Sequence, residues 1–139
     1  MSKILFKVNV STVIMKDGKF LVIKRADDEE VFPGMWGIPG GTVEPTDPTL
    51  GAALVRECEE EVGIVIKNNV LIADDIHDKG DKGAIYLVYK SEYLSGEPKP
   101  LDGTAEVHWL DIETIRSLQL TPKTLDMIEL CQNTTRNDL

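Results

Sequence analysis

Hydrophobic and polar residues alternate at the start of the chain, which is the spacing of a β-strand with one buried face. In residues 4–25, two apolar runs flank the sequence Lys16-Asp17-Gly18-Lys19. Because an Asp-Gly pair accommodates the positive φ of a tight turn, this segment predicts a β-hairpin. The pattern breaks up in residues 26–37, where the acidic run Asp27-Asp28-Glu29-Glu30 and the pair Pro33-Gly34 predict a loop with solvated charges.

A helical period replaces the alternation after residue 47. Asp47 and Pro48 predict the start of a helix, as its N-cap and first helical residue, and Gly63 predicts a left-handed end just after Val62. The apolar residues of this segment recur at the spacing of one helix face: Ala52, Ala53, Leu54, Val55, Cys58 and Val62. The glutamates of the segment are therefore left on the other side.

The second half of the chain predicts further strands and two more helices. Strands are expected at residues 64–66, 70–76, 84–89 and 107–110. Helices are expected at 111–118 and 121–131, the second with Thr121 as N-cap and Pro122 after it, and residues 133–139 are expected to fray. This order of elements predicts one domain, residues 1–139, of the α/β class with helices packed on a sheet.

The composition narrows the class of protein. With 42% apolar and 28% charged residues among 139, the chain resembles an ordinary globular domain. A net charge of −9 argues against binding a nucleic-acid duplex, whose phosphates require a basic surface. The N-terminal segment has the features of neither a signal peptide nor a membrane span, so we expect a cytoplasmic protein without membrane contact. Cys58 and Cys131 have no spacing typical of zinc sites or disulfides.

Four carboxylates within five positions, from Glu57 to Glu61, are the most unusual feature of the sequence. On a helix, Glu57, Glu60 and Glu61 share one face near the C-terminal end, where like charges repel and the helix dipole disfavours anions. Because stability alone does not favour this arrangement, it indicates either a fully solvated acidic face or a site for a divalent cation. Carboxylates without His or Cys suit Mg²⁺ or Mn²⁺, which also bind phosphate oxygens.

Together with the glycines that precede it, this helix resembles the Nudix box of the Nudix hydrolases. The matching stretch runs from Gly40 to Ile64, with Gly40-Gly41, an acid at Asp47, and Arg56-Glu57-x-x-Glu60-Glu61-x-Gly63. Trp36-Gly37-Ile38-Pro39 resembles the family's lead-in to the box. The sequence departs from the family pattern in its aspartate at residue 47 and in one extra residue before Arg56. The resemblance implies an α/β/α sandwich with a mixed sheet, and a metal-dependent pyrophosphohydrolase acting on nucleoside diphosphates linked to another group.

The resemblance also implies roles for the residues of the box. Glu57, Glu60 and Glu61 would hold Mg²⁺ or Mn²⁺, with the carbonyl of Gly40 as a further ligand. Arg56 would orient one of the glutamates through a charge-assisted hydrogen bond. The expected reaction is attack of water on phosphorus.

The general base is either Glu57 or an acid from a later loop, for which Glu97 and Glu106 are candidates. Ser95-Gly96-Glu97-Pro98 resembles the stretch that carries a further metal ligand in enzymes that remove oxidised purine nucleoside triphosphates. For both late acids, the alternative is an exposed charge without a role.

Substrate contacts are expected mainly in the loop before the box. Phe32 and Trp36 have flat side chains that could stack a nucleobase, although a role in covering the core is equally expected. Lys24 and Arg25, at a strand end, are candidates to pair with phosphates, although exposed cations at strand ends more often have no role. Gly41 is a candidate for close approach of the substrate to the backbone.

The sequence leaves several functions open. Nucleoside triphosphates, including oxidised ones, are the favoured substrates, with ADP-ribose and nucleotide sugars as alternatives. A nucleotide-binding Nudix module without catalysis is the alternative from another class, and the intact box argues against it. A purely acidic interaction protein is a further alternative, whereas a calcium-binding protein is disfavoured because the chain has no DxDxDG loop. The oligomeric state is also left open, with a homodimer as one candidate, since dimers are common in the family.

Overall fold

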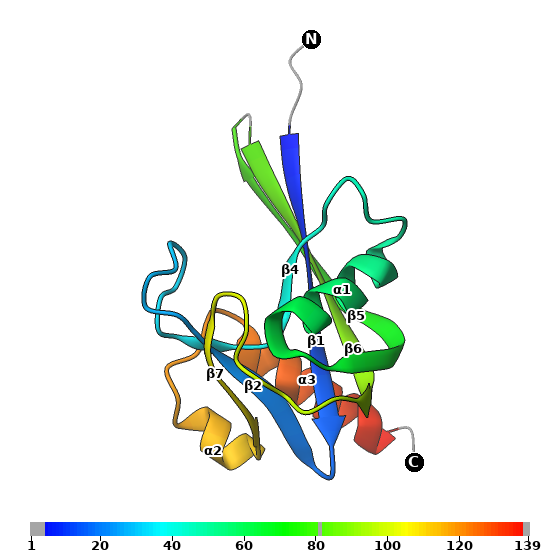
Figure 1. The fold of residues 1–139 in the computed structure, drawn as a ribbon, viewed down its shortest axis with the longest axis vertical. Coiled ribbons are helices and arrows are strands. Elements are labelled where there is room, and N and C mark those ends of the chain that lie inside the picture. The colour runs from blue at the N-terminus through cyan, green and yellow to red at the C-terminus, as the bar shows by residue number, and fades with distance from the viewer. Residues whose placement is uncertain (1–4, 81, 138–139) are drawn as a thin grey trace.

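The computed structural model describes residues 5–80 and 82–137, which form a mixed sheet and three helices (Figure 1). The elements are, in order, β1 (Leu5–Lys16), β2 (Lys19–Arg25), β3 (Trp36–Gly37), β4 (Gly40–Thr42), α1 (Leu50–Val62), β5 (Val65–Lys79), β6 (Lys82–Ser95), β7 (Thr104–Leu110), α2 (Ile112–Arg116) and α3 (Thr124–Asn137).

Strand β1 is the centre of the sheet. It pairs in parallel with β6, from Leu5 beside Lys82 to Met15 beside Glu92, and antiparallel with both β2 and β4. Beyond it, β5 pairs with β6, while β2 carries β7 along one edge and β3 near its end. The sheet is therefore mixed, as the sequence predicted.

The predicted hairpin at the start of the chain is confirmed. Asp17 and Gly18 adopt φ of 53° and 76°, the left-handed pair that a two-residue turn between β1 and β2 requires. The strands then separate, because β2 continues along β7 and β3 rather than along β1.

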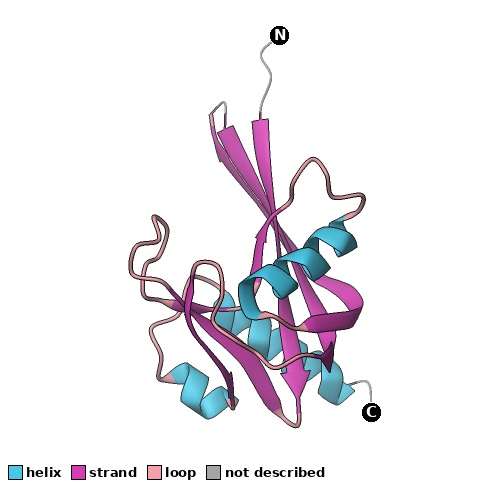
Figure 2. Ribbon diagram, viewed as in Figure 1, coloured by secondary structure: helices cyan, strands magenta, loops and turns pink. Residues whose placement is uncertain are grey.

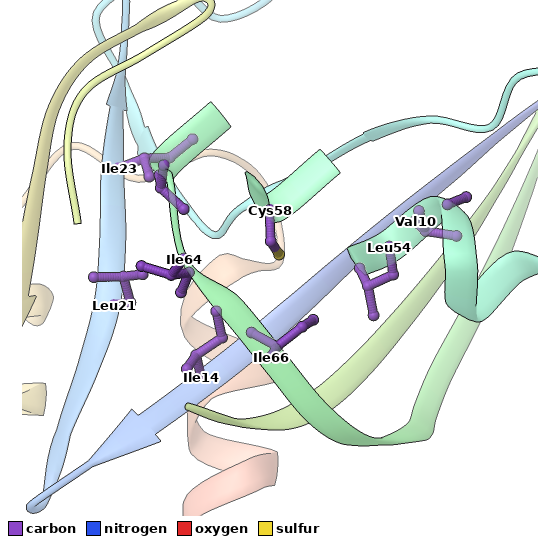
Figure 3. Close-up of a cluster of buried hydrophobic side chains, with 10 residues drawn as sticks. Val10, Ile14, Leu21, Ile23, Leu54, Cys58, Ile64 and Ile66 are labelled. Carbon is purple, nitrogen blue, oxygen red and sulfur yellow. The ribbon is translucent and has the colours of Figure 1, made fainter. Parts of the chain in front are cut away.

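Helices cover both faces of the sheet, which gives the predicted α/β/α sandwich (Figure 2). On one face, Leu54 and Cys58 of α1 pack on apolar residues of β1, β2 and β5 (Figure 3). On the other face, Phe20 and Val22 pack against Ile128 of α3. Successive residues of β2 point to opposite faces, so its Leu21 and Ile23 belong to the first core while Phe20 and Val22 belong to the second.

The predicted start of α1 is wrong, whereas its predicted end is confirmed. Thr49 is the N-cap and accepts a hydrogen bond from the Ala52 N–H at 3.0 Å. Asp47 does not cap the helix because its carboxylate is bound by Arg56 and by the Glu44 N–H. At the other end, Gly63 is left-handed with φ of 72°.

The predicted start of α3 is also wrong. Thr121 donates its N–H to the Trp36 carbonyl at 2.8 Å and so extends beside β3 instead of capping a helix. Lys123 then has φ of 67°, which is not helical, and α3 begins at Thr124. Its far end reaches Asn137, so most of the predicted frayed tail is helical; residues 138–139 lie outside the described part.

The strands of the second half are longer than predicted. Residues 64–66 and 70–76 were predicted as two strands, but β5 is continuous and irregular at the point where Asn68 has φ of 53°. It stays one strand because β6 pairs with it on both sides of that irregularity. Strand β7 likewise begins at Thr104, earlier than the predicted 107–110, because it pairs with β2 up to Arg25.

Candidate active site

The glycines of β4 lie directly against two glutamates of α1. The Gly40 N–H donates to the Glu61 Oε1 at 3.2 Å. A Cβ placed on Gly41 would lie only 2.2 Å from the Glu57 Oε2. Gly40 is equally confined on its other side, where an added Cβ would lie 2.2 Å from the Val10 carbonyl oxygen of β1. The glycine pair therefore lets the helix carboxylates approach the sheet, which no larger residue would allow.

Arg56 donates hydrogen bonds to three acidic residues of this site: Asp47, Glu57 and Glu60. Its Nε and Nη2 donate to the two carboxylate oxygens of Asp47, each at 2.8 Å, in the paired geometry that makes such contacts strong. Its Nη1 donates to both Glu57 and Glu60 at 3.0 Å. A further bond at 3.2 Å reaches the Thr42 carbonyl, so Arg56 also fixes the loop between β4 and α1.

Despite the extra residue before Arg56, Asp47 still contacts the Arg56 guanidinium. The Asp47 side chain is 5% exposed, and the hydrogen bond from Arg56 lowers its pKa to about 2. Asp47 also accepts from the Glu44 N–H at 2.8 Å, which closes the loop on itself. Asp47 therefore fixes the position of Arg56 and does not cap α1.

Glu61 is the most perturbed carboxylate of the site. Its carboxylate is shielded from solvent although part of the residue is accessible, and this burial raises its pKa to about 8. The Gly40 hydrogen bond and the positive charge of Arg25 oppose the rise, whereas the negative charges of Glu57 and Asp102 add to it. Burial also raises the pKa of Glu57, against the effect of the Arg56 hydrogen bond. Neighbouring carboxyls with raised pKa values would gain strongly from a bound cation.

The chemistry of these side chains fits a hard divalent cation, since all of the donors are oxygens. Within residues 5–80 and 82–137, however, no three acidic, His or Cys side chains already converge on one point. The Glu57 and Glu60 carboxylates instead share the Nη1 of Arg56, each at 3.0 Å. The Glu60 side chain is 50% exposed, and it would have to leave Arg56 to reach a cation bound beside Glu57 and Glu61.

The segment after β6 runs along the C-terminal end of α1. The Lys99 N–H donates to the Val62 carbonyl at 2.9 Å and the Leu101 N–H to the Glu61 carbonyl at 3.0 Å. Glu97 begins this segment and is exposed. Asp102, which the sequence did not single out, ends it, and its charge acts on Glu61. Its position in the sequence does not indicate that it lies near Glu61, because it is the turns of this segment that bring it back to α1.

Glu106 lies elsewhere. It is on β7, bound to Lys24 at 3.8 Å and to the His108 ring at 3.1 Å. Glu106 is the partner of Lys24 in the sheet, and Lys24 follows Val22 on the face that carries α3. The structure therefore does not bring Glu106 and Lys24 together with the box glutamates.

Arg25 is on the opposite face from Lys24, and its charge acts on Glu61. Trp36 is beside Lys24 in the sheet and packs on the second core, with its ring centroid 5.8 Å from that of His108. This is the core-covering alternative predicted for Trp36. Phe32 is 43% exposed, in the loop before β3, with φ of 49°.

Known proteins share this architecture. A family model described as the NUDIX domain matches residues 5–131. The nucleoside triphosphatase NudI of Escherichia coli strain K12 is 41% identical over 88 residues, which are 58% of this chain and 62% of that protein, less than two thirds of its length.

Solved structures agree over a longer part of the chain. The MutT NUDIX hydrolase from Burkholderia pseudomallei superposes with a TM-score of 0.73 at 28% identity, over 91% of this chain and 98% of that one. The MutT protein from Methanosarcina mazei Go1 superposes with a TM-score of 0.77 at 25% identity, over 96% and 98% respectively. No helix in the described part of the chain is long and apolar enough to span a membrane.

Proposed function

This chain belongs to the Nudix domain family, and we propose that it is a divalent-metal-dependent hydrolase that cleaves a phosphoanhydride of a nucleoside triphosphate. The observation that carries the proposal is the seating of Glu57 and Glu61 against Gly40 and Gly41, with Arg56 bound to the adjacent acids. The match of the NUDIX model to residues 5–131 confirms the family inferred from the box, while the substrate and the roles of single residues are our proposals.

The residues proposed to hold Mg²⁺ or Mn²⁺ are Glu57, Glu60 and Glu61, with the Gly40 carbonyl as a further ligand. When bound, such a cation acts as a Lewis acid on phosphoryl oxygens and lowers the pKa of a coordinated water. Arg56 serves as a positioning residue: it fixes Glu57 through one N–H while Asp47 fixes the guanidinium itself.

For the general base we propose Glu57 or Glu97. Glu57 is 15% exposed and lies within the box, and Glu97 begins the segment that is bonded to the end of α1. The position of Glu106 on the other face of the sheet, paired with Lys24, favours both of these over Glu106. Arg25 is favoured over Lys24 as the residue that binds a substrate phosphate, because the charge of Arg25 acts on Glu61 whereas Lys24 pairs with Glu106.

Nucleoside triphosphates are the proposed substrates because the curated relative at 41% identity is a nucleoside triphosphatase. ADP-ribose and nucleotide sugars are the alternative, and the branch that removes oxidised nucleotides is included among the triphosphates. We further propose that residues 1–139 act as a single domain in the cytoplasm. Phe32 remains the candidate for contact with the base, since it is exposed in the loop that follows Arg25.

The experiment is a turnover assay with Mg²⁺ or Mn²⁺ over canonical and oxidised nucleoside triphosphates, ADP-ribose and nucleotide sugars, with the phosphate products identified. Glu60→Gln and Glu61→Gln are expected to abolish turnover. Glu59→Gln is the matched control, because Glu59 is exposed on the same helix and changes the charge equally. Pyrophosphate release that the two Gln variants lose and the control keeps supports the proposal.

Two other results would contradict it. Equal losses in all three variants would mean that the charge of the helix, and not the box, matters. Absence of turnover on every substrate, with nucleotide binding retained, would favour the non-catalytic binding module.

A further inference from the structure

We propose that Glu29 is an internal competitor of the substrate, whose carboxylate occupies Arg25 in the free protein and is displaced when a substrate phosphate binds there. The inference rests on the proposed function for the identity of the anion. It assigns a role to one member of the acidic run at residues 27–30, which the sequence alone predicts to be a solvated loop tip.

Glu29 differs from the other acids of the run in its environment. Asp27, Asp28 and Glu30 are exposed, whereas the Glu29 side chain is 34% exposed and turned toward the protein. Its carboxylate lies 3.5 Å from the Arg25 Nη2. The Arg25 Nε donates to the Val31 carbonyl at 2.7 Å, so one guanidinium contacts both Glu29 and Val31 of this loop.

The same carboxylate also bridges two loops. A Cβ placed on Gly103 would lie 2.4 Å from the Glu29 Oε1, so the side chain rests directly on that glycine. Beside this contact, the Ala26 N–H donates to the Gly103 carbonyl at 3.1 Å. The loop before β3 and the segment before β7 therefore lie side by side (Figure 1), with Glu29 in contact with Gly103.

This meeting point lies next to the box. Asp102 precedes Gly103, and the charges of both Asp102 and Arg25 act on Glu61. The segment that carries Asp102 is also bonded to α1 through the Leu101 N–H and the Glu61 carbonyl. Arg25 is therefore close enough to the box for a bound phosphate to interact with it, and Glu29 already contacts the guanidinium that this phosphate would need.

The strength of the contact suits a competitor rather than a permanent brace. At 3.5 Å it is longer than the 2.7–2.9 Å typical of strong charge-assisted hydrogen bonds, and both side chains are partly solvated. A substrate phosphate offers more charge and several acceptor oxygens, so it is the better partner for the guanidinium. Because partly exposed ion pairs are weak, the competition is expected to change affinity by about two- to fivefold.

The test compares Glu29→Gln with Glu30→Gln, which removes the same charge from the exposed neighbour. The readouts are the Kd of inorganic pyrophosphate by calorimetry with Mg²⁺ present, and kcat and KM for a nucleoside triphosphate. Glu29→Gln is expected to lower Kd and KM by about two- to fivefold with kcat almost unchanged. Glu30→Gln is expected to leave all three constants near those of the parent protein.

A double substitution identifies Arg25 as the shared partner. In an Arg25→Gln background, Glu29→Gln is expected to have no further effect on the Kd of pyrophosphate, because no guanidinium is left to release. An equal gain from Glu29→Gln and Glu30→Gln, a gain that persists without Arg25, or no gain at all would overturn the proposal. If no triphosphate is turned over, the proposed function fails, while the pyrophosphate titration still decides the role of Glu29.

Discussion

A single methyl group at Gly41 tests whether the glycine pair exists to seat the Glu57 carboxylate. In Gly41→Ala the new Cβ would lie 2.2 Å from Glu57 Oε2 and 2.3 Å from its Cδ, where ordinary contacts begin at 3.4 Å. The carboxylate must therefore retreat by roughly 1 Å, a displacement that costs on the order of a hundredfold in rate when it affects reacting groups. Gly41 does not have a positive φ, so alanine fits the backbone itself.

The stability of Gly41→Ala is expected to stay close to that of the parent, because the atom that must move is the end of a flexible side chain. Gly40→Ala is the matched control. There the added Cβ would lie 2.2 Å from the Val10 carbonyl oxygen and 2.6 Å from the Ser11 Cα, which are backbone atoms of the central strand. Overpacking against atoms that cannot retreat costs about 1–3 kcal/mol or more, so this variant is expected to lose stability as well as activity.

The assay is kcat for a nucleoside triphosphate with Mg²⁺, beside the thermal midpoint of each metal-free variant. We expect Gly41→Ala to lower kcat while its thermal midpoint stays close to that of the parent. Gly40→Ala is expected to lower both. Full activity in Gly41→Ala would refute the reasoning, since it would show that Glu57 works as well from a displaced position. A large loss of stability in Gly41→Ala would refute it equally, because the clash would then not be confined to a side chain.

Further predictions concern the same helix and its supports. Arg56→Lys cannot keep both bonds to Asp47 and is expected to lower kcat by about 10- to 100-fold with little loss of secondary structure by circular dichroism. Since the pKa of Asp47 is lowered to about 2 from 3.8, its carboxylate stabilises the fold above about pH 4 and this contribution disappears as the pH falls through 2; urea unfolding of Asp47→Asn should show a weaker acid dependence. Since burial raises the pKa of Glu61 to about 8 from 4.5, the metal-free protein should lose stability as the pH rises between those values, and Glu61→Gln should remove both that loss and the rise in thermal midpoint on adding Mg²⁺. Leu54→Ala, at a fully buried position, should cost about 2–5 kcal/mol in urea unfolding, whereas Leu50→Ala, 39% exposed on the same helix, should cost far less.

Local signals in the sequence predicted the features that depend on neighbouring residues. The turn at Asp17-Gly18, the end of α1 at Gly63 and the buried face of α1 follow from short-range patterns and are confirmed. The starts of α1 and α3 could not be predicted in this way. Asp47 is drawn to Arg56 and Thr121 to Trp36, and each of these distant partners outcompetes the local cap.

The sequence predicted which glutamates form the candidate site, but it did not predict which other residues lie around them. The box residues cluster along one helix, so their spacing alone placed them together. Lys24 and Arg25 are adjacent in sequence, but the alternation of a strand sends them to opposite faces, and the prediction did not choose between them. Asp102 comes near Glu61, and Glu29 comes near Arg25, through loops whose course depends on contacts with Glu61 and Gly103, which no local pattern encodes.

The pairing of β1 with β6 has a consequence for how the protein folds. Thr12 and Ser91, joined by their hydroxyls across these strands at 2.5 Å, are 79 residues apart in the chain. Closing so large a loop is slow, and β5, whose Ile66 belongs to the core beneath α1, joins the sheet through β6. The self-repelling acidic helix therefore gains this part of its support late, after the residues of β6 have been added to the sheet. Substitutions in β6, far from any phosphate, are accordingly expected to delay the appearance of the site during refolding.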